Sequence, residues 1–451
     1  MQIHSSVYLA MLAITACATP TRPGSASPAP ETTEPSPPPV VEATAQAVYR
    51  GASVWTGNGF EALDLAIGDG HFVAAGQVAD TTRVVDLTGS FVVPAYGNGH
   101  QHLALADEAT NRGYLHSGVY YVWNPNSRAS FITDDDRAFW ARPDTYDYKT
   151  SMGGVTTPGS HPEPLYVEQL SQWVYPGATY DDFYLDAFHY ARSEQEVERT
   201  LDRLVSQGAD FVKAYLLGSE LYTPPKADGT PTCTRGLDPA LVPHLVAQAH
   251  ARNLVIAFHI ETRHDFRVAV DAGADFVAHL PAHLRPPEDP TQGQLLPEDA
   301  EAAAKMGLGA MPTYSIARSR ADAALARGVQ VDLTATYAMQ AANLRLLQDA
   351  GVRLIVGTDL GVGTALGEAR HWVEIGGLTP EEAVGALLAT GAALFPERRI
   401  GCFEAGCEAD FLVLAADPRL DMAALSAIEL RVKAGTALTV TAPAEAIPAR
   451  P

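Results

Sequence analysis

Short apolar runs separated by amphipathic segments dominate the chain from about residue 94 onward. Runs such as GADFVK, NLVIAFH, GADFVAH and VRLIVGTD are each long enough for one buried strand, and segments with helical periodicity lie between them. Strands that alternate with helices in this way predict an α/β fold with a parallel sheet. Eight such runs fall between residues 94 and 396, so we expect a closed (β/α)8 TIM barrel there.

The amphipathic segments carry signals for helix starts and stops. Ser193 stands before the first apolar position of residues 193–208 and Gly208 follows the last one. Serine is a preferred N-cap and glycine a preferred residue after a helix, so this segment is expected to be helical. The same logic predicts helices at residues 263–273, 296–307, 335–351 and 378–394.

Both ends of the folded part show a different pattern. Residues 46–93 and 397–440 contain short runs of alternating apolar and polar positions, interrupted by glycine. This pattern indicates short strands joined by turns. We expect the two segments to form one composite β-sandwich beside the barrel.

Residues 124–186 are the least regular part and are rich in Tyr, Trp, Pro and Asp, as expected for loops that shape a pocket over the barrel mouth.

The first 45 residues are not expected to belong to the fold. Residues 7–16 are apolar but too few to cross a bilayer, and small residues precede Cys17. Residues 1–17 resemble a bacterial lipoprotein signal peptide that would leave Cys17 as a lipid anchor, with a plain secretory signal as the alternative. Residues 18–45 are proline-rich and predict a disordered tether. The expected location is the cell envelope, anchored to the inner or outer membrane and facing the periplasm, or outside the cell.

Composition and charge narrow the class of partner. The formal net charge of −22 argues against a nucleic-acid partner, which would require basic patches. Cys402 and Cys407 flank the turn-like FEAG and could be joined in an oxidising compartment. An oligomer is compatible with the sequence.

Polar side chains stand at or just after the ends of the predicted barrel strands. They are His100, His102, Lys213, His259, His279 and Asp359. Each taken alone has an ordinary explanation as a rim or core residue. In a barrel, however, the C-terminal ends of the strands meet at one mouth, so all six are expected to converge. Imidazoles, a carboxylate and a lysine in one mouth predict a metal site and a hydrolase.

These motifs resemble the amidohydrolase superfamily, in particular its imidazolonepropionase-like and metal-dependent peptidase branch. The similarity rests on the HxH after VVPAYG, the lysine of GADFVK, the two later histidines and the aspartate of GTD. The closing segments GLTPEEAV and GCFEAGCEADFLVL are also similar to the family pattern. The resemblance covers about residues 47–435.

The resemblance implies a centre of two divalent ions, and its nitrogen and oxygen ligands suit Zn²⁺. His100, His102 and Asp359 would bind one ion, and His259 and His279 the other. Lys213, carboxylated by carbon dioxide, would bridge both ions together with a hydroxide. Asp359 would carry the proton from the nucleophile to the leaving nitrogen of a small-molecule amide or peptide-like substrate.

The chain departs from the family pattern at two places. Asn98 stands where an aspartate is usual, which bears on how His100 is oriented. Glu261 stands where peptidases of the branch often have a tyrosine. Its carboxylate would repel a carboxylate of the substrate. Tyr215 and His161 are further candidates for substrate contact.

Three other functions fit parts of this pattern. A mononuclear deaminase or cyclic amidohydrolase shares the histidines but lacks the bridging lysine, and often has HxxE where this chain has HxE at His259. A lactone or phosphotriester hydrolase would use the same centre. A non-catalytic binding lipoprotein could keep the barrel but should have lost ligands. The leading expectation is hydrolysis of a C–N bond, in a peptide or in another amide.

Overall fold

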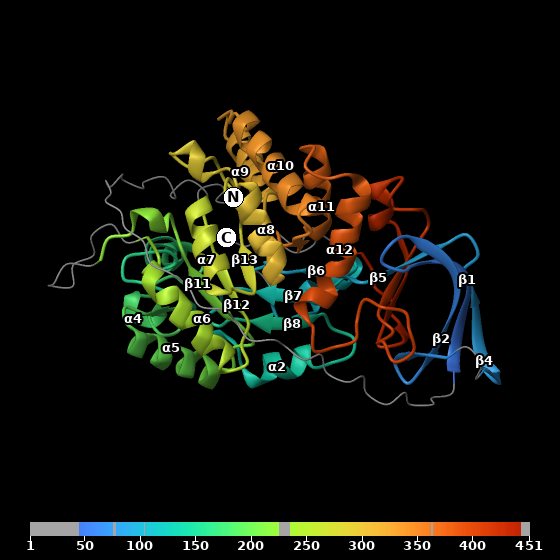
Figure 1. The fold of residues 1–451 in the computed structure, drawn as a ribbon. Coiled ribbons are helices and arrows are strands. Elements are labelled where there is room, and N and C mark those ends of the chain that lie inside the picture. The colour runs from blue at the N-terminus through green and yellow to red at the C-terminus, as the bar shows by residue number, and fades with distance from the viewer. Residues whose placement is uncertain (1–44, 75–77, 103, 225–234, 362–363, 443–451) are drawn as a thin grey trace.

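A computed structural model describes residues 45–74, 78–102, 104–224, 235–361 and 364–442 (Figure 1). The predicted signal peptide, Cys17 and all of the predicted tether except residue 45 lie outside the described residues. Within the described ranges, no helix combines the length and the apolar character needed to cross a membrane.

Parallel strands form the centre of the molecule. Strand β6 (Tyr96–Asn98) pairs with β7 (Val119–Asn124), which pairs with β8 (Asp147–Thr150). A second run of parallel pairs comprises, in order, β9 (Gly154–Thr156), β11 (Val212–Tyr215), β12 (Ile256–His259), β13 (Phe276–Ala278), β14 (Gly309–Met311) and β15 (Arg353–Leu354).

Backbone hydrogen bonds join the two runs of strands at both ends. Asp210, just before β11, donates its N–H to the carbonyl of Thr150 in β8 at 2.8 Å, and Gly99, just after β6, donates to Val356 at 2.8 Å. The pairing therefore returns to its starting strand. The α/β class and the parallel strands are confirmed, and the ring of pairing is consistent with the predicted barrel.

The third of the eight apolar runs lies near GGVTTPGSH, residues 153–161, and predicts a single barrel strand there. The structure differs at this position. Two short strands, β8 and β9, occupy it, and the chain between them includes Met152 with a left-handed φ of 58°. β8 pairs with one neighbour of this position and β9 with the other. An extra strand, β10 (Phe188–Tyr190), pairs with β9 and was not predicted.

Helices pack around the parallel strands (Figure 1). The predicted helices are present as α5 (Glu194–Gln207), α7 (Arg263–Ala272), α8 (Pro297–Met306), α10 (Thr334–Asp349) and α12 (Pro380–Leu394). Ser193 caps α5 and Gly208 ends it at a φ of 81°, as its position predicts. Helices that the sequence analysis did not identify are α1 (Glu108–His116), α2 (Asp134–Trp140), α3 (Ser171–Trp173), α4 (Tyr180–Phe183), α6 (Val242–His250), α9 (Ser315–Leu325) and α11 (Ala365–Glu374).

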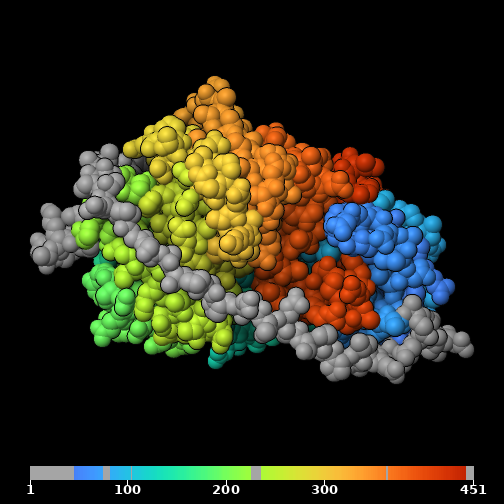
Figure 2. All heavy atoms as spheres, in the orientation of Figure 1, coloured from blue at the N-terminus to red at the C-terminus, as the bar shows by residue number. Residues whose placement is uncertain are grey.

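Strands from both ends of the chain share one further sheet. They are β1 (Ala45–Trp55), β2 (Phe60–Gly68), β3 (His71–Val73), β4 (Val78–Asp86), β5 (Phe91–Pro94), β16 (Phe411–Leu414), β17 (Ile428–Lys433) and β18 (Thr436–Ala437). β5 and β16 join the two halves as antiparallel partners, with Val92 opposite Val413. The first and last described segments accordingly lie side by side (Figure 2). That this sheet forms a sandwich, with domain boundaries at residues 93 and 397, remains a prediction.

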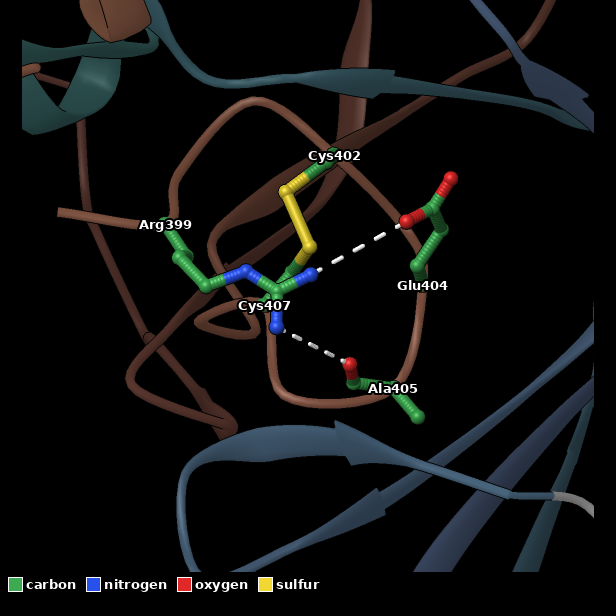
Figure 3. The surroundings of a disulfide bond; sticks show 5 residues. All are labelled: Arg399, Cys402, Glu404, Ala405 and Cys407. Atoms are coloured by element: carbon green, nitrogen blue, oxygen red, sulfur yellow. Dashed lines mark hydrogen bonds and ion pairs between the residues drawn. A yellow bond between two sulfur atoms is a disulfide. The ribbon is translucent and has the colours of Figure 1, made fainter. Parts of the chain in front are cut away.

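A disulfide joins Cys402 and Cys407, as their positions suggested. Arg399 lies across this loop, with its guanidinium 3.8 Å from the carboxylate of Glu404 and 3.4 Å from the carbonyl of Ala405 (Figure 3). The loop packs against the core of the terminal sheet, since Cys407 is fully buried there.

Candidate metal centre

The candidate ligands occupy the C-terminal ends of the parallel strands. Lys213 lies within β11, and His259 is the last residue of β12. His279 follows β13 directly, while Asp359 comes five residues after β15. His100 follows β6, and its carbonyl accepts the N–H of Asp359 at 2.8 Å, which fixes the first and last strand ends against each other.

Several residues at these strand ends hold a strained backbone. His279, Thr313 and Asp359 have φ values of 73°, 52° and 51°, in the left-handed region that non-glycine residues seldom adopt. Such a conformation costs on the order of 1–3 kcal/mol per residue and clusters at functional sites. The surrounding structure therefore holds these residues in an unfavourable backbone conformation, and this conformation sets the directions of their side chains.

His100, His102 and Asp359 bring three ligand atoms to one point. The two Nε2 atoms are 3.2 Å apart, and Asp359 Oδ1 lies 3.1 Å from His102 Nε2 and 3.7 Å from His100 Nε2. Ligands about 2.1 Å from a zinc ion and about 90–110° apart would lie about 3.0–3.4 Å from each other. The three atoms thus have nearly the spacing of one face of a coordination shell.

Hydrogen bonds at Nδ1, the ring nitrogen that faces away from the candidate metal site, set the tautomers of His102 and His279. His102 Nδ1 lies 3.3 Å from the carbonyl of Asn126, which can only accept, so Nδ1 carries the proton. His279 Nδ1 lies 2.6 Å from the hydroxyl of Thr313, whose own proton goes to the carbonyl of Pro312 at 2.8 Å. Both rings therefore present an unprotonated Nε2, the form that binds a metal ion.

His259 and Lys213 add unpartnered atoms to the same mouth. The ring of His259 lies 4.4 Å from that of His279, which in turn lies 4.6 Å from that of His100. Among the described residues, His259 Nε2 and Lys213 Nζ are buried and have no hydrogen-bond partner. A buried polar atom without a partner is costly, so both atoms are suited to a bound group.

Burial sets the charge state of these groups. Desolvation lowers the pKa of His100, His259 and His279 far below the usual value, which keeps the imidazoles neutral. Desolvation also lowers the pKa of Lys213 to about 7, so a large part of the amine is neutral near pH 7. Burial alone would raise the pKa of Asp359, but the close contacts of its carboxylate with the rings of His102 and His100 lower it, which keeps the carboxylate ionised.

The candidate substrate residues His161, Tyr215 and Glu261 lie beside the second histidine pair. The ring of His161 is 5.4 Å from that of His259 and 5.2 Å from that of Tyr215. Glu261 Oε1 is 3.6 Å from His259 Nε2. All three residues line one cavity together with the candidate ligands. Desolvation lowers the pKa of His161 to about 3, so this ring is neutral and can accept or donate a hydrogen bond.

Three neighbours of the ligands were not singled out in the sequence. Thr313 and Asn126 orient His279 and His102 through the bonds described above, and no sequence signal marks a hydroxyl or a backbone carbonyl for that role. The ring of His283 stacks on His279 at 4.4 Å and an interplanar angle of 24°. Its spacing of four residues from His279 in HLPAH was the available signal.

Asn98 supports the strand end that carries His100. Its side-chain carbonyl accepts the N–H of His100 at 3.2 Å, and its amide donates to the hydroxyl of Thr358 at 3.0 Å. Asn98 therefore joins the segment after β6 to the segment after β15. It holds the backbone of His100, and both of its hydrogen bonds involve neutral groups.

Asp265 fixes the two loops that follow β11 and β12. This fully buried carboxylate accepts N–H groups from Gly218, Ser219, Glu261 and Thr262, at 2.7–3.1 Å, and the hydroxyl of Ser219 at 2.6 Å. It lies in the first turn of α7 and forms a capping box with Thr262. One side chain thus ties together the loops beyond Lys213 and His259.

We expect Asp265→Ala to lower the free energy of unfolding by about 3 kcal/mol or more, because several buried N–H groups would lose their acceptor at about 1–3 kcal/mol each. Urea denaturation measures the change. Asp271→Ala, at an exposed position of the same helix, is the matched control and should stay within about 0.5 kcal/mol of the wild type. Equal effects of the two substitutions would contradict the proposed role of Asp265.

The cavity over these residues has a volume of about 1600 Å³. It is lined by the six candidate ligands and by side chains from the irregular segment at residues 124–175. The space is far larger than a metal centre needs and is ample for an organic substrate.

The parallel α/β fold and the clustered side chains of His100, His102 and Asp359 are features expected of a metal-dependent hydrolase. The model of the Amidohydrolase family matches residues 150–441, and the chain belongs to this family. No curated protein shows significant similarity to the chain.

Solved structures with a similar fold include a Xaa-Pro dipeptidase with bound methionine in the active site, with a TM-score of 0.67 and 17% identity over 87% of this chain and 99% of that chain. The A. niger ochratoxinase has a TM-score of 0.65 and 20% identity over 88% and 96% of the two chains. Molinate hydrolase has a TM-score of 0.64 and 17% identity over 88% and 95%. At these identities the similarity establishes the fold.

Proposed function

We propose that the protein is a binuclear metal-dependent amidohydrolase that cleaves an amide or peptide-like C–N bond of a small molecule. The observation that carries this proposal is the convergence of His100 Nε2, His102 Nε2 and Asp359 Oδ1 beside the unpartnered Lys213 Nζ and His259 Nε2. A mononuclear centre would account for the first three atoms but would leave the buried lysine amine without a purpose.

Each residue has a place in the proposed centre. His100, His102 and Asp359 would hold one divalent ion, and His259 and His279 the second. The neutral amine of Lys213 would attack the carbon of carbon dioxide and lose a proton, which leaves a carbamate anion with two oxygens able to bridge the ions. Nitrogen and oxygen ligands of this kind suit Zn²⁺.

The bound ions would supply an acidified water as nucleophile and a Lewis acid for the scissile carbonyl. The chain's own residues perform the remaining tasks. Asp359, ionised at neutral pH, would accept the proton of the nucleophile and deliver it to the leaving nitrogen. Tyr215 and His161, whose rings lie 5.3 and 5.4 Å from that of His259, would orient the substrate.

The names of the structural neighbours favour C–N bond cleavage. A Xaa-Pro dipeptidase, a prolidase with bound N-methylphosphonate-L-proline and phenylurea hydrolase B share the fold. They support the metal-dependent peptidase branch for this chain. The carboxylate of Glu261 would repel a substrate carboxylate next to His259. The proposed substrate is therefore not recognised there through a C-terminal carboxylate.

We further propose that the protein is exported and lipid-anchored through Cys17. The disulfide between Cys402 and Cys407 supports an oxidising compartment, because such bonds seldom persist in the cytosol of mesophiles. The proline-rich residues 18–45 would then keep the hydrolase clear of the membrane surface.

Metal analysis of the purified protein, combined with a substrate screen, tests the function. We expect about two equivalents of divalent metal per chain and hydrolysis of at least one compound among N-acyl amino acids, dipeptides, cyclic imides and lactones. Chelation should remove the activity and added Zn²⁺ should restore it. About one equivalent with deaminase activity would favour the mononuclear alternative, and no bound metal would favour a binding lipoprotein.

A further inference from the structure

A continuous wall of tyrosine and phenylalanine runs from the candidate metal ligands to the rim of the cavity. The carbonyl of Asn126 accepts from His102, and the Asn126 amide donates to the hydroxyl of Tyr166 at 3.4 Å. The ring of Tyr166 stacks with that of Tyr175 at 6.3 Å, and Tyr175 meets Phe131 edge-on at 5.4 Å. Of these residues, all but His102 belong to the irregular segment at residues 124–186, which the sequence predicts to shape the pocket.

The wall has its own supporting core. Tyr166 and Tyr175 pack against the buried Phe183, with ring separations of 5.4 and 5.7 Å, in a cluster separate from the barrel core. The guanidinium of Arg128 lies 4.5 Å from the centre of the Phe131 ring and 5.0 Å from those of Tyr175 and Phe183. Such contacts preorganise the rings.

The charge of Arg128 is already balanced within the protein. Its Nε donates to the carboxylate of Asp186 at 2.6 Å and its Nη2 to the carbonyl of Asp182 at 2.8 Å. Arg128 therefore braces the rings of Phe131, Tyr175 and Phe183 while its charge is met by Asp186. Phe131, Tyr166 and Tyr175 all line the cavity.

The outer end of the wall remains exposed. Phe131 is 57% exposed, and Leu105 and Val174, which line the same cavity, are 47% and 36% exposed. Single exposed apolar residues are ordinary, but large ones that line a cavity shared with catalytic groups mark a binding surface. These three residues together with Tyr175 are called the apolar rim below.

We propose that the apolar rim binds an aromatic or long aliphatic group of the substrate, attached on one side of the scissile C–N bond. This inference rests on the proposed function, because it takes the bond to be cleaved at the metal centre. The continuity of the wall from His102 to Phe131 within one cavity is what assigns the rim to the substrate. The substrate class is then an amide with one large apolar substituent.

Alkyl hydroxamates test the inference without knowledge of the natural substrate, because the hydroxamate head group chelates metal ions and the chain can be varied. Calorimetry on the zinc-loaded protein would compare acetohydroxamate, hexanohydroxamate, decanohydroxamate and benzohydroxamate. We expect the Kd to fall with chain length by about two- to fourfold per methylene until the rim is covered, since each buried CH₂ contributes about 0.8 kcal/mol at most.

Phe131→Ala should weaken decanohydroxamate and benzohydroxamate about tenfold and leave acetohydroxamate within about twofold. Val174→Ser, a second rim variant, should act in the same direction. Leu325→Ala is the matched control, because Leu325 is 61% exposed on α9 and does not line the cavity. The control should bind every hydroxamate as the wild type does.

Each alternative gives a distinct result. A Kd independent of chain length, or equal losses in Phe131→Ala and Leu325→Ala, would overturn the apolar subsite while leaving the metal centre intact. Failure of acetohydroxamate to bind the zinc-loaded protein would instead refute the metal centre. In that case the apolar rim would be supported only if decanohydroxamate still bound and Phe131→Ala weakened that binding. A change of oligomeric state in Phe131→Ala would identify the rim as an interface between copies and overturn its role in substrate binding.

Discussion

Replacing Lys213 with alanine is expected to lower kcat/KM by about a thousandfold or more, the scale of losing a main electrostatic element of an active site. The substitution removes the amine that becomes the bridging carbamate, so neither ion keeps its shared ligand. The side chain of Lys213 is buried, and its Nζ has no hydrogen-bond partner among the described residues. The substitution therefore removes no hydrogen bond within the described part of the protein. Activity and metal content should therefore fall while the fold persists.

Short carboxylic acids provide the decisive measurement for this variant. Acetate or propionate can enter the space left by the lysine side chain and supply two oxygens in place of the carbamate. Part of the activity of Lys213→Ala should return with added acetate, in a saturable manner, and circular dichroism should match the wild type. Lys305→Ala, at an exposed position of α8, is the control and should be fully active without acetate. Unchanged turnover in Lys213→Ala would refute the carbamate.

The helices and parallel strands that could be predicted are those in which local and tertiary preferences agree. In α5, the cap at Ser193, the apolar stripe and the terminal Gly208 all indicate the same element, and all three have that role in the structure. The strands at Lys213 and His259 are fully buried on both faces, so their apolar runs identified them without ambiguity.

The parts that escaped prediction depend on contacts between distant segments. β10 is only three residues long and is stabilised by pairing with β9, a contact that no local pattern encodes. The helices of residues 124–186 are short, and they do not share one core. Tyr180 and Phe183 of α4 pack in a separate aromatic cluster, whereas Trp140 of α2 packs against the main core. α9 carries a weak apolar stripe interrupted by Arg318 and Arg320, so its periodicity was not detected.

The candidate site shows the same division. The histidines, the lysine and the aspartate could be chosen from the sequence because parallel strands align their C-terminal ends. The orienting partners could not, because Thr313 and Asn126 act through a hydroxyl and a backbone carbonyl that nearly any loop could offer. Asn98 was recognised only as a departure from the family pattern. The structure adds that its amide bridges the backbone of His100 and the hydroxyl of Thr358.

Replacing Asp359 with asparagine should lower kcat by about 10³- to 10⁴-fold, because it removes both a charged metal ligand and the proposed proton carrier. The close contacts with the rings of His102 and His100 keep the pKa of Asp359 low, so the wild-type carboxylate is ionised throughout the neutral range. A neutral amide cannot accept the proton of the nucleophile. It can still coordinate through its oxygen, so kcat should fall further than metal content does.

Measuring kcat and bound metal on the same preparation separates these two roles. Asp289→Asn is the matched control, because Asp289 lines the same cavity but is exposed and caps a short helical turn through Thr291. It should keep kcat within about twofold of the wild type, as expected for a surface substitution. If Asp359→Asn lost its metal and its activity in equal proportion, Asp359 would be a ligand alone. The proton would then have to be carried by another group at the mouth, with the neutral His161 and His283 beside His259 as the nearest candidates.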